Sequence, residues 1–173
     1  MIKARRRAWR SGTMVLLVFV GLIFFGCGKD GARALKMGDP APAFSVQDLQ
    51  GATVSLDKHQ GKPVVLRFFL PDCKYCRADT AVFNEYYQTY RDMGLGVIYV
   101  NTAPKTDDVQ QFVSELGIMF PVVLDPARKI ADQYRIQVVP QTIVLDPAHK
   151  IVGAILGGVS KEQLDALLLP FVK

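Results

Sequence analysis

Two cysteines separated by two residues, Cys73 and Cys76, are the side chains best suited to chemistry in this chain. They follow an apolar run over residues 64–70 and open a segment with helical spacing. Unpaired backbone N–H groups and the positive end of the helix dipole stabilise an anion at such a position. Because the thiolate is the form of cysteine that attacks a disulfide, we expect Cys73 to be the exposed nucleophile. We expect Cys76, one helical turn further on, to be the resolving thiol.

Lys74 adds a positive charge beside the first cysteine and would favour its thiolate further. Two other uses of the pair stay open. A structural zinc site needs four ligands, and the other cysteine and histidine side chains of the chain are Cys27, His59 and His149. A purely structural disulfide within the pair would close a very short loop and would do little for a core of this size.

The dipeptide Val139–Pro140 opens an expected strand over residues 141–145. An ordinary trans proline would be tolerated there at the edge of a sheet. The arrangement that we favour is a cis proline that faces the cysteine pair. It would leave the backbone of Val139 free to pair with an extended substrate segment and to hold the substrate cysteine near Cys73.

The elements that must position these residues follow from apolar spacing and turn residues. Strands are expected at 64–70, 95–100, 121–124, 141–145 and 150–156, after an N-terminal β-hairpin of residues 44–49 and 53–56. Helices are expected at 73–92, 106–116, 127–134 and 160–169, the second capped by residues 106–108 and the last by a Ser160–Gln163 capping box. The pattern predicts one α/β domain over residues 43–173, with a central mixed sheet.

Residues 1–27 are typical of a bacterial secretory signal. Five basic residues and no acid precede an apolar stretch over residues 14–25. That stretch is shorter than the ~20 residues that span a bilayer comfortably. The basic start predicts that the body of the protein lies outside the cytoplasm and close to a membrane.

Cys27 ends this segment, and the small residue Gly26 precedes it, as in a lipoprotein cleavage site. Phe24 departs from the leucine that usually stands there. We expect Cys27 to be lipidated, with an uncleaved signal anchor and a cleaved signal that leaves a spare thiol as alternatives. Residues 28–42 are rich in Gly, Pro and charge and are expected to form a tether with a reach of roughly 20 Å.

The net charge of +5 comes from the N-terminus. Once the five basic residues before residue 27 are set aside, sixteen basic and sixteen acidic residues remain. The body is therefore neutral, and no nucleic-acid partner is expected. Three cysteines are too few for a disulfide-stapled scaffold, so the core must hold the fold.

Several motifs together resemble the TlpA/ResA group of thioredoxin-like proteins. They are Gly38–Asp39–Pro40–Ala41–Pro42, Gly61–Lys62–Pro63, Cys73-x-x-Cys76, Phe120–Pro121 and residues 139–146, and the resemblance spans about residues 36–170. It implies a thioredoxin-like fold with helices on both faces of the sheet and a membrane-anchored, extracytoplasmic disulfide reductase, many such proteins serving cytochrome c maturation. It also implies a protein disulfide substrate, a membrane-bound thiol electron donor and no cofactor. By the resemblance, Pro140 is cis and Asp79 takes the place of an acidic residue near the active site.

The chain departs from that group at Asp72, where a tryptophan is usual, and at Ala81, where a helix proline is frequent. Arg67 stands where thioredoxin has a buried acid and this group often has asparagine. An arginine on a central strand must reach solvent or pair with a carboxylate. We predict that Arg67 pairs with Asp79 or Asp72 and tunes the ionisation of the cysteine pair.

Two other functions stay open. A thioredoxin-fold peroxidase of the peroxiredoxin type would use Cys76 as its peroxidatic cysteine, but that family has threonine where this chain has Cys73. A copper-carrying assembly factor would need a late histidine. His149 is available, although we expect it to be a solvated residue of a turn.

Overall fold

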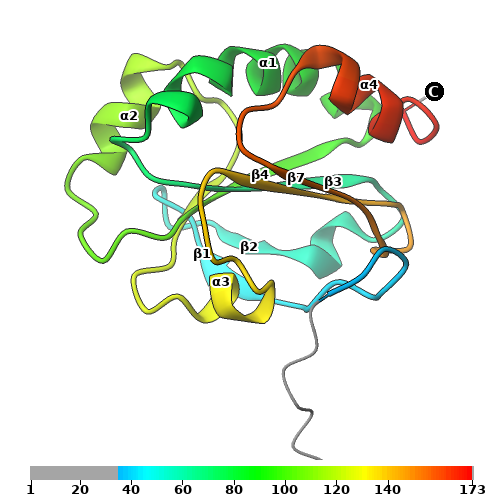
Figure 1. Ribbon diagram of the computed structural model, residues 1–173, viewed down its shortest axis with the longest axis horizontal. Helices are drawn as coiled ribbons and strands as arrows, with labels where there is room; N and C mark the ends of the chain where they lie inside the picture. Colours follow the sequence, from blue (N-terminus) through cyan, green and yellow to red (C-terminus); the bar gives the residue numbers. More distant parts are fainter. Residues whose placement is uncertain (1–34, 173) are drawn as a thin grey trace, which may run out of the picture. The chain divides into compact units, whose positions relative to one another are not determined.

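The computed structural model describes residues 35–172. The predicted signal, Cys27 and the first part of the predicted tether lie outside the described residues. The middle layer is a five-stranded mixed sheet (Figure 1), whose strands in spatial order are β5 (Val122–Leu124), β4 (Gly96–Asn101), β3 (Val64–Phe69), β6 (Gln141–Leu145) and β7 (Ile151–Leu156). The predicted mixed sheet is therefore confirmed.

The central strand β3 lies parallel to β4 and antiparallel to β6. All six of its residues are buried. A strand with neighbours on both sides and elements over both faces has no solvent-facing positions, which explains its nearly continuous apolar sequence. Arg67 is the polar exception, and it lies in the middle of the strand.

Elements cover both faces of the sheet (Figure 1). One face carries α1 (Lys74–Tyr90), α2 (Val109–Glu115) and α4 (Lys161–Leu168). The other face carries α3 (Lys129–Gln133) and the antiparallel hairpin of β1 (Ser45–Gln47) and β2 (Thr53–Ser55). Two 3₁₀ turns, η1 (Leu56–His59) and η2 (Arg91–Met93), complete the described elements. Two clusters of buried apolar residues fill the two interfaces.

Helix α1 presents a buried stripe to the sheet. Cys76, Thr80 and Phe83 recur at helical spacing along this stripe and are fully buried. The helix continues into η2 and stops at Gly94, whose φ of 97° is left-handed and suits glycine. The position of Cys76 on the buried stripe is thus set by the same spacing that holds the helix to the sheet.

Two local expectations change. Asp108 occupies the N-cap position of α2, but no side-chain hydrogen bond caps that helix, so the predicted cap is wrong. The second difference concerns the predicted tether. Gly38 donates its N–H to Ile151, and Ala41 donates its N–H to His149, both at 2.8 Å. This part of the predicted tether is therefore joined by hydrogen bonds to the start of β7.

Helix α4 begins with the predicted capping box. The Gln163 N–H donates to Ser160 Oγ, and the Ser160 N–H donates to Gln163 Oε1 at 2.9 Å. These two bonds satisfy N–H groups that the helix leaves unpaired. They also fix the position of Val159, the residue directly before the cap.

We predict that Ser160→Ala lowers the free energy of unfolding by about 1 kcal/mol, because the N-cap oxygen is lost. Urea denaturation measures this difference. Ser114→Ala is the matched control: Ser114 is exposed inside α2 and its hydroxyl donates only to the Gln111 carbonyl of its own helix. Equal stability of the two variants would contradict the assigned role of the capping box.

Candidate active site

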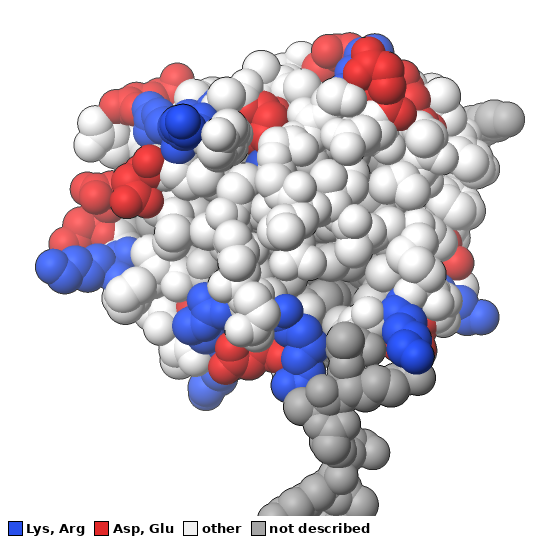
Figure 2. Space-filling view, in the orientation of Figure 1, with Lys and Arg blue, Asp and Glu red and all other residues white. Residues whose placement is uncertain are grey.

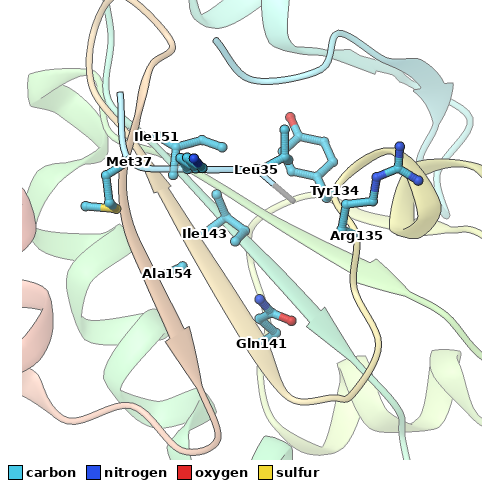
Figure 3. Close-up of a pocket in the computed structure, with 9 residues that line it drawn as sticks. Leu35, Met37, Tyr134, Arg135, Gln141, Ile143, Ile151 and Ala154 are labelled. Carbon is cyan, nitrogen blue, oxygen red and sulfur yellow. The ribbon is translucent and has the colours of Figure 1, made fainter. Parts of the chain in front are cut away.

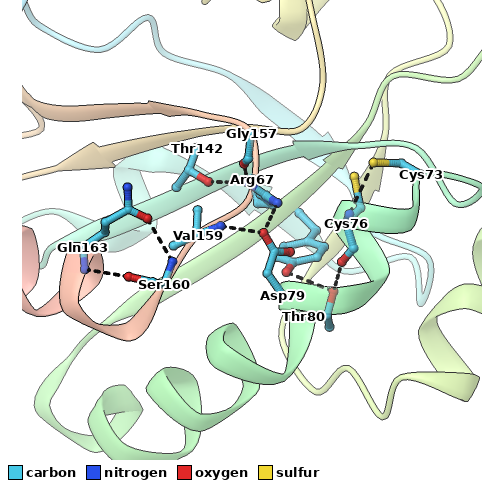
Figure 4. A network of polar contacts seen from close by, with 11 residues as sticks. Arg67, Cys73, Cys76, Asp79, Thr80, Thr142, Gly157, Val159, Ser160 and Gln163 are labelled. Carbon is cyan, nitrogen blue, oxygen red and sulfur yellow. Dashed lines mark hydrogen bonds and ion pairs between the residues drawn. The ribbon is translucent and has the colours of Figure 1, made fainter.

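The two cysteines lie at the junction between β3 and α1 (Figure 4). Cys73 is the N-cap residue of α1, with an extended backbone, and its Sγ accepts the Cys76 N–H at 3.3 Å. A tight turn precedes it, in which the Cys73 N–H donates to the Leu70 carbonyl at 3.2 Å. The sulfur of Cys73 therefore takes the place that a capping oxygen usually holds, next to the unpaired N–H groups of the helix.

The two sulfurs differ in access to solvent. Cys73 is half-buried, whereas Cys76 is 0% exposed and belongs to the core beneath α1. They are not bonded to each other, so the structure describes the dithiol form. Burial, together with a hydrogen bond to Cys73, raises the pKa of Cys76 to about 12, while the charge of Arg67 acts in the opposite direction.

The Val139–Pro140 peptide bond is cis, as expected. Gln141, the next residue, pairs with Phe68 near the end of β3, so the proline and the cysteine-bearing turn lie at the same edge of the sheet. The Pro140 carbonyl accepts the Gly157 N–H at 2.8 Å. The backbone of Val139 makes no hydrogen bond within residues 35–172. Its N–H and C=O can therefore pair with another extended segment.

Arg67 is fully buried and forms an ion pair through Nη2 with Asp79 on α1 (Figure 4). The sequence left Asp79 and Asp72 as alternative partners, and the structure selects Asp79, since Asp72 is exposed. The guanidinium carbon lies 5.2 Å from the centroid of the Phe83 ring, in cation–π geometry. The predicted pairing of Arg67 with a nearby carboxylate is therefore confirmed.

Three further groups complete the surroundings of this ion pair (Figure 4). Arg67 Nη1 donates to Thr142 Oγ1 at 2.8 Å and to the Gly157 carbonyl at 3.0 Å. The Val159 N–H donates to Asp79 Oδ2 at 2.9 Å. Burial raises the pKa of Asp79 above its usual value, and the charge of Arg67 and the hydrogen bond from Val159 offset only part of that rise. Arg67 Nε and Asp79 Oδ1 are buried without a hydrogen-bond partner.

Sequence reasoning did not identify Thr142, Gly157 or Val159. Gly157 and Val159 contribute only backbone atoms, which carry no side-chain signal. Thr142 lies directly opposite Arg67 in the pairing of β3 with β6. That register depends on a long-range pairing, so a threonine in an apolar run gave no indication of its partner.

Other predicted residues lie further from this network. Lys74 is exposed, and its Nζ lies 4.9 Å from the centroid of the neighbouring Tyr75 ring. His149 is 9% exposed, and its Nε2 lies 3.0 Å from the His59 carbonyl oxygen. The expectation of a solvated His149 is therefore wrong, because the turn packs it against the segment before β3. That segment leads into the start of β3, at the opposite end from Cys73.

The surface formed by β7 and the loop after it carries no charged side chain of its own. In the orientation of Figure 1, the middle of the visible face is nearly free of charged side chains, and acidic and basic groups gather around its rim (Figure 2). Residues 151–160, which form β7 and the loop after it, contain no charged residue. Val138 and Leu156 are exposed here, and Leu156 pairs with Gln141. This surface suits contact with an apolar polypeptide segment.

A cavity of about 600 Å³ lies against the sheet face that carries α3 (Figure 3). Its floor includes Ile143 and Ala154, and its walls include Met37 and Tyr134. Neither cysteine lines it. The cavity is therefore separate from the surroundings of the two sulfurs.

Residues 35–172 contain neither a metal-binding cluster nor a membrane-spanning helix. Nowhere in this range do three or more His, Cys, Asp or Glu side chains gather in a way that could hold a metal ion. The helices of the same range are all too short or too polar to cross a membrane.

Comparison with known proteins agrees with this geometry. The AhpC/TSA family profile matches residues 37–154. Proteins named thiol-disulfide oxidoreductase ResA from Bacillus thuringiensis (strain Al Hakam) and Bacillus subtilis (strain 168) are 32% and 27% identical to this chain. The first match covers 90% of this chain and 91% of the relative, and the second covers 95% and 92%.

Solved structures show the same fold. A DsbE-type thiol:disulfide interchange protein from Chlorobium tepidum has a TM-score of 0.76 at 27% identity. The thioredoxin domain of a thiol-disulfide oxidoreductase from Bacteroides vulgatus has a TM-score of 0.72 at 29% identity. Each match covers 81% of this chain and 100% of the other. The expected thioredoxin-like fold is thus confirmed, and the chain belongs to the AhpC/TSA family, as a thiol–disulfide oxidoreductase of the ResA type.

Proposed function

We propose that this oxidoreductase reduces protein disulfides outside the cytoplasm, with Cys73 as the attacking thiol and Cys76 as the resolving thiol. The contrast between the two sulfurs carries the proposal. Cys73 is half-buried at the start of α1 and accepts a helix N–H, whereas Cys76 is fully buried behind it. An accessible sulfur at a helix N-terminus suits attack on a disulfide, and a shielded one suits a second, intramolecular step.

The proposed reaction has two exchanges. The Cys73 thiolate attacks one sulfur of a substrate disulfide, and the other substrate sulfur leaves as a thiolate. Cys76 then loses its proton to solvent and attacks Cys73 Sγ, which forms the Cys73–Cys76 disulfide and releases the second substrate thiolate. The substrate sulfurs gain two electrons and take up two protons from solvent. A membrane-bound thiol protein would return two electrons and two protons to the pair.

The substrate segment is proposed to bind as an added strand beside Val139. Its free backbone groups and the uncharged surface around Val138 and Leu156 support this placement. By resemblance to the TlpA/ResA group, precursors of cytochromes c are the substrate class that we propose. Main-chain hydrogen bonds at Val139 would bind substrate segments of many different sequences, and the apolar surface would favour substrates that are unfolded.

A membrane tether is proposed from the N-terminal sequence. The basic start, the apolar stretch over residues 14–25 and the Gly26–Cys27 pair support export and lipidation at Cys27. One acyl anchor alone gives marginal membrane binding, so more than one chain is expected at this cysteine.

The peroxidase alternative is less well supported. A peroxidatic cysteine must be an accessible thiolate. Cys76 is 0% exposed, and burial raises its pKa to about 12. Copper carriage through His149 is also less well supported, because that histidine contacts the His59 carbonyl at the other end of β3.

We predict that Cys76→Ser accumulates a mixed disulfide between Cys73 and substrate proteins, because the resolving thiol is gone. Non-reducing electrophoresis followed by mass spectrometry identifies the linked cysteine. Reduction of insulin disulfides by this variant should fall to the rate of the reductant alone.

Cys73→Ser is the matched control and should trap nothing, since Cys76 is buried. A mixed disulfide through Cys76 in that control would reverse the two roles. Peroxide consumption that depends on Cys76 and survives the loss of Cys73 would favour the peroxidase instead.

We predict that Cys27→Ser abolishes incorporation of labelled fatty acid and releases the protein from the membrane fraction of an expressing bacterium. The reason is that Cys27 would carry the anchor. Cys73→Ser should keep both the label and the membrane location. A Cys27→Ser protein that stays in membranes without label would point to an uncleaved signal anchor.

A further inference from the structure

A charge pair lies directly behind the proposed resolving thiol. Asp79 follows Cys76 by three residues on α1, and residues at this spacing are neighbours on a helix. A free carboxylate there would be a natural acceptor for the Cys76 proton. Asp79 is already the counter-ion of Arg67, however: its Oδ2 accepts from both Arg67 and the Val159 N–H, whereas its Oδ1 has no hydrogen-bond partner.

We propose that Arg67 is a positioning residue: it holds Asp79 as its counter-ion, so that Asp79 does not take the Cys76 proton and the fixed charge of Arg67 stabilises the Cys76 thiolate instead. This inference rests on the proposed resolving role of Cys76. It concerns how that thiol becomes reactive. Arg67 stabilises the Cys76 thiolate, whereas Asp79, by compensating the charge of Arg67, weakens that stabilisation.

The ionised state of the pair follows from burial. An arginine does not lose its proton in a protein, and Arg67 is 0% exposed. If Asp79 took up a proton, the buried guanidinium would be left without a partner of opposite charge, which is strongly unfavourable. Burial leaves the pKa of Asp79 above its usual value even though the guanidinium and the Val159 N–H offset part of the rise, so the ionised state depends on the buried charge of Arg67.

The charge of Arg67 is also held in one place. Its Nη1 donates to Thr142 on β6 and to the Gly157 carbonyl in the loop after β7. The Gly157 N–H in turn donates to the Pro140 carbonyl. Hydrogen bonds thus link the cis proline, through Gly157 and Arg67, to Asp79 on the helix of Cys76. Figure 4 shows the part of this series from Gly157 to Asp79.

Among the groups that act on Cys76, the positive charge comes from Arg67. The titratable groups that act on Cys76 are Cys73 at the start of α1 and Arg67 on β3, and Asp79 follows Cys76 by three residues on α1. Tyr99 of β4 lies close by, and burial raises its pKa, so it stays neutral. The ion pair itself is contacted by uncharged groups: Thr142 of β6 accepts from Arg67, and the Val159 N–H from the loop before α4 donates to Asp79.

Two mechanisms for Cys76 therefore predict different pH dependence. With a fixed charge and a thiol pKa of about 12, the resolving step should accelerate about tenfold for each pH unit through the neutral range, in proportion to the thiolate. With Asp79 as proton acceptor, the rate should level off once that carboxylate is ionised. The two mechanisms also predict opposite effects of removing the carboxylate.

The test measures the rate of the resolving step in the full-length wild-type protein and in its Asp79→Asn variant. A mixed disulfide between Cys73 and thionitrobenzoate is formed, and stopped-flow absorbance follows the release of the coloured thiolate as Cys76 attacks. Asp79→Asn leaves the charge of Arg67 uncompensated and should lower the Cys76 pKa by on the order of one unit. The release should then be about threefold faster, since the lower basicity offsets part of the gain in thiolate.

Two further variants separate charge from structure. The double variant Arg67→Met/Asp79→Asn has neither charge, so its release should lose the acceleration seen in Asp79→Asn. Arg67→Lys keeps the positive charge and should retain the wild-type pH profile. Thermal unfolding followed by circular dichroism shows that each variant is folded. Slower release in folded Asp79→Asn, or a wild-type rate that levels off near neutral pH, would overturn the inference. Failure of the wild-type protein to release the probe at all would instead contradict the resolving role of Cys76.

Discussion

The ion pair between Arg67 and Asp79 joins the central strand to the helix that carries both active-site sulfurs. A buried cation with one carboxylate partner cannot move without leaving a charge unpaired in the core. The same guanidinium also binds β6 and the loop after β7. The positions of Cys76, the cis proline and the start of α4 are therefore linked through this ion pair. The apolar side chains of the sheet surround this ion pair and exclude water from it.

Burial gives the two cysteines different chemistry although they are only one helical turn apart. At the helix start, the Cys76 N–H donates to the accessible sulfur of Cys73, a position that suits a thiolate. The core opposes negative charge at Cys76 and raises its pKa to about 12. An accessible sulfur beside a shielded one is suited to sequential thiol exchange. Both properties come from placing the pair where a buried strand ends and a helix begins.

Much of this arrangement could be predicted from local sequence. The apolar run of β3, the Ser160 cap and the two-residue spacing of the cysteines are local signals, and each has a direct structural consequence. The cis proline followed from its place before a strand together with a family resemblance.

Long-range contacts could not be predicted in this way. The sequence offered two partners for Arg67 and could not choose between them, since Asp72 and Asp79 are both close along the chain. The Gly157 carbonyl and the Val159 N–H reach the ion pair from the other end of the domain through backbone atoms. His149 was misjudged for a similar reason, because its burial depends on a segment about ninety residues away.

The reduction potential of the Cys73–Cys76 couple tests the central claim most directly. Oxidation of the full-length protein would be titrated in glutathione and dithiothreitol buffers, with the two thiols followed by alkylation and mass spectrometry. A disulfide reductase should show one two-electron transition nearer to the value of thioredoxin, about −270 mV, than to that of a strong periplasmic oxidant, about −120 mV. A midpoint near the oxidant value, or cysteines that never form a disulfide with each other, would contradict the claim.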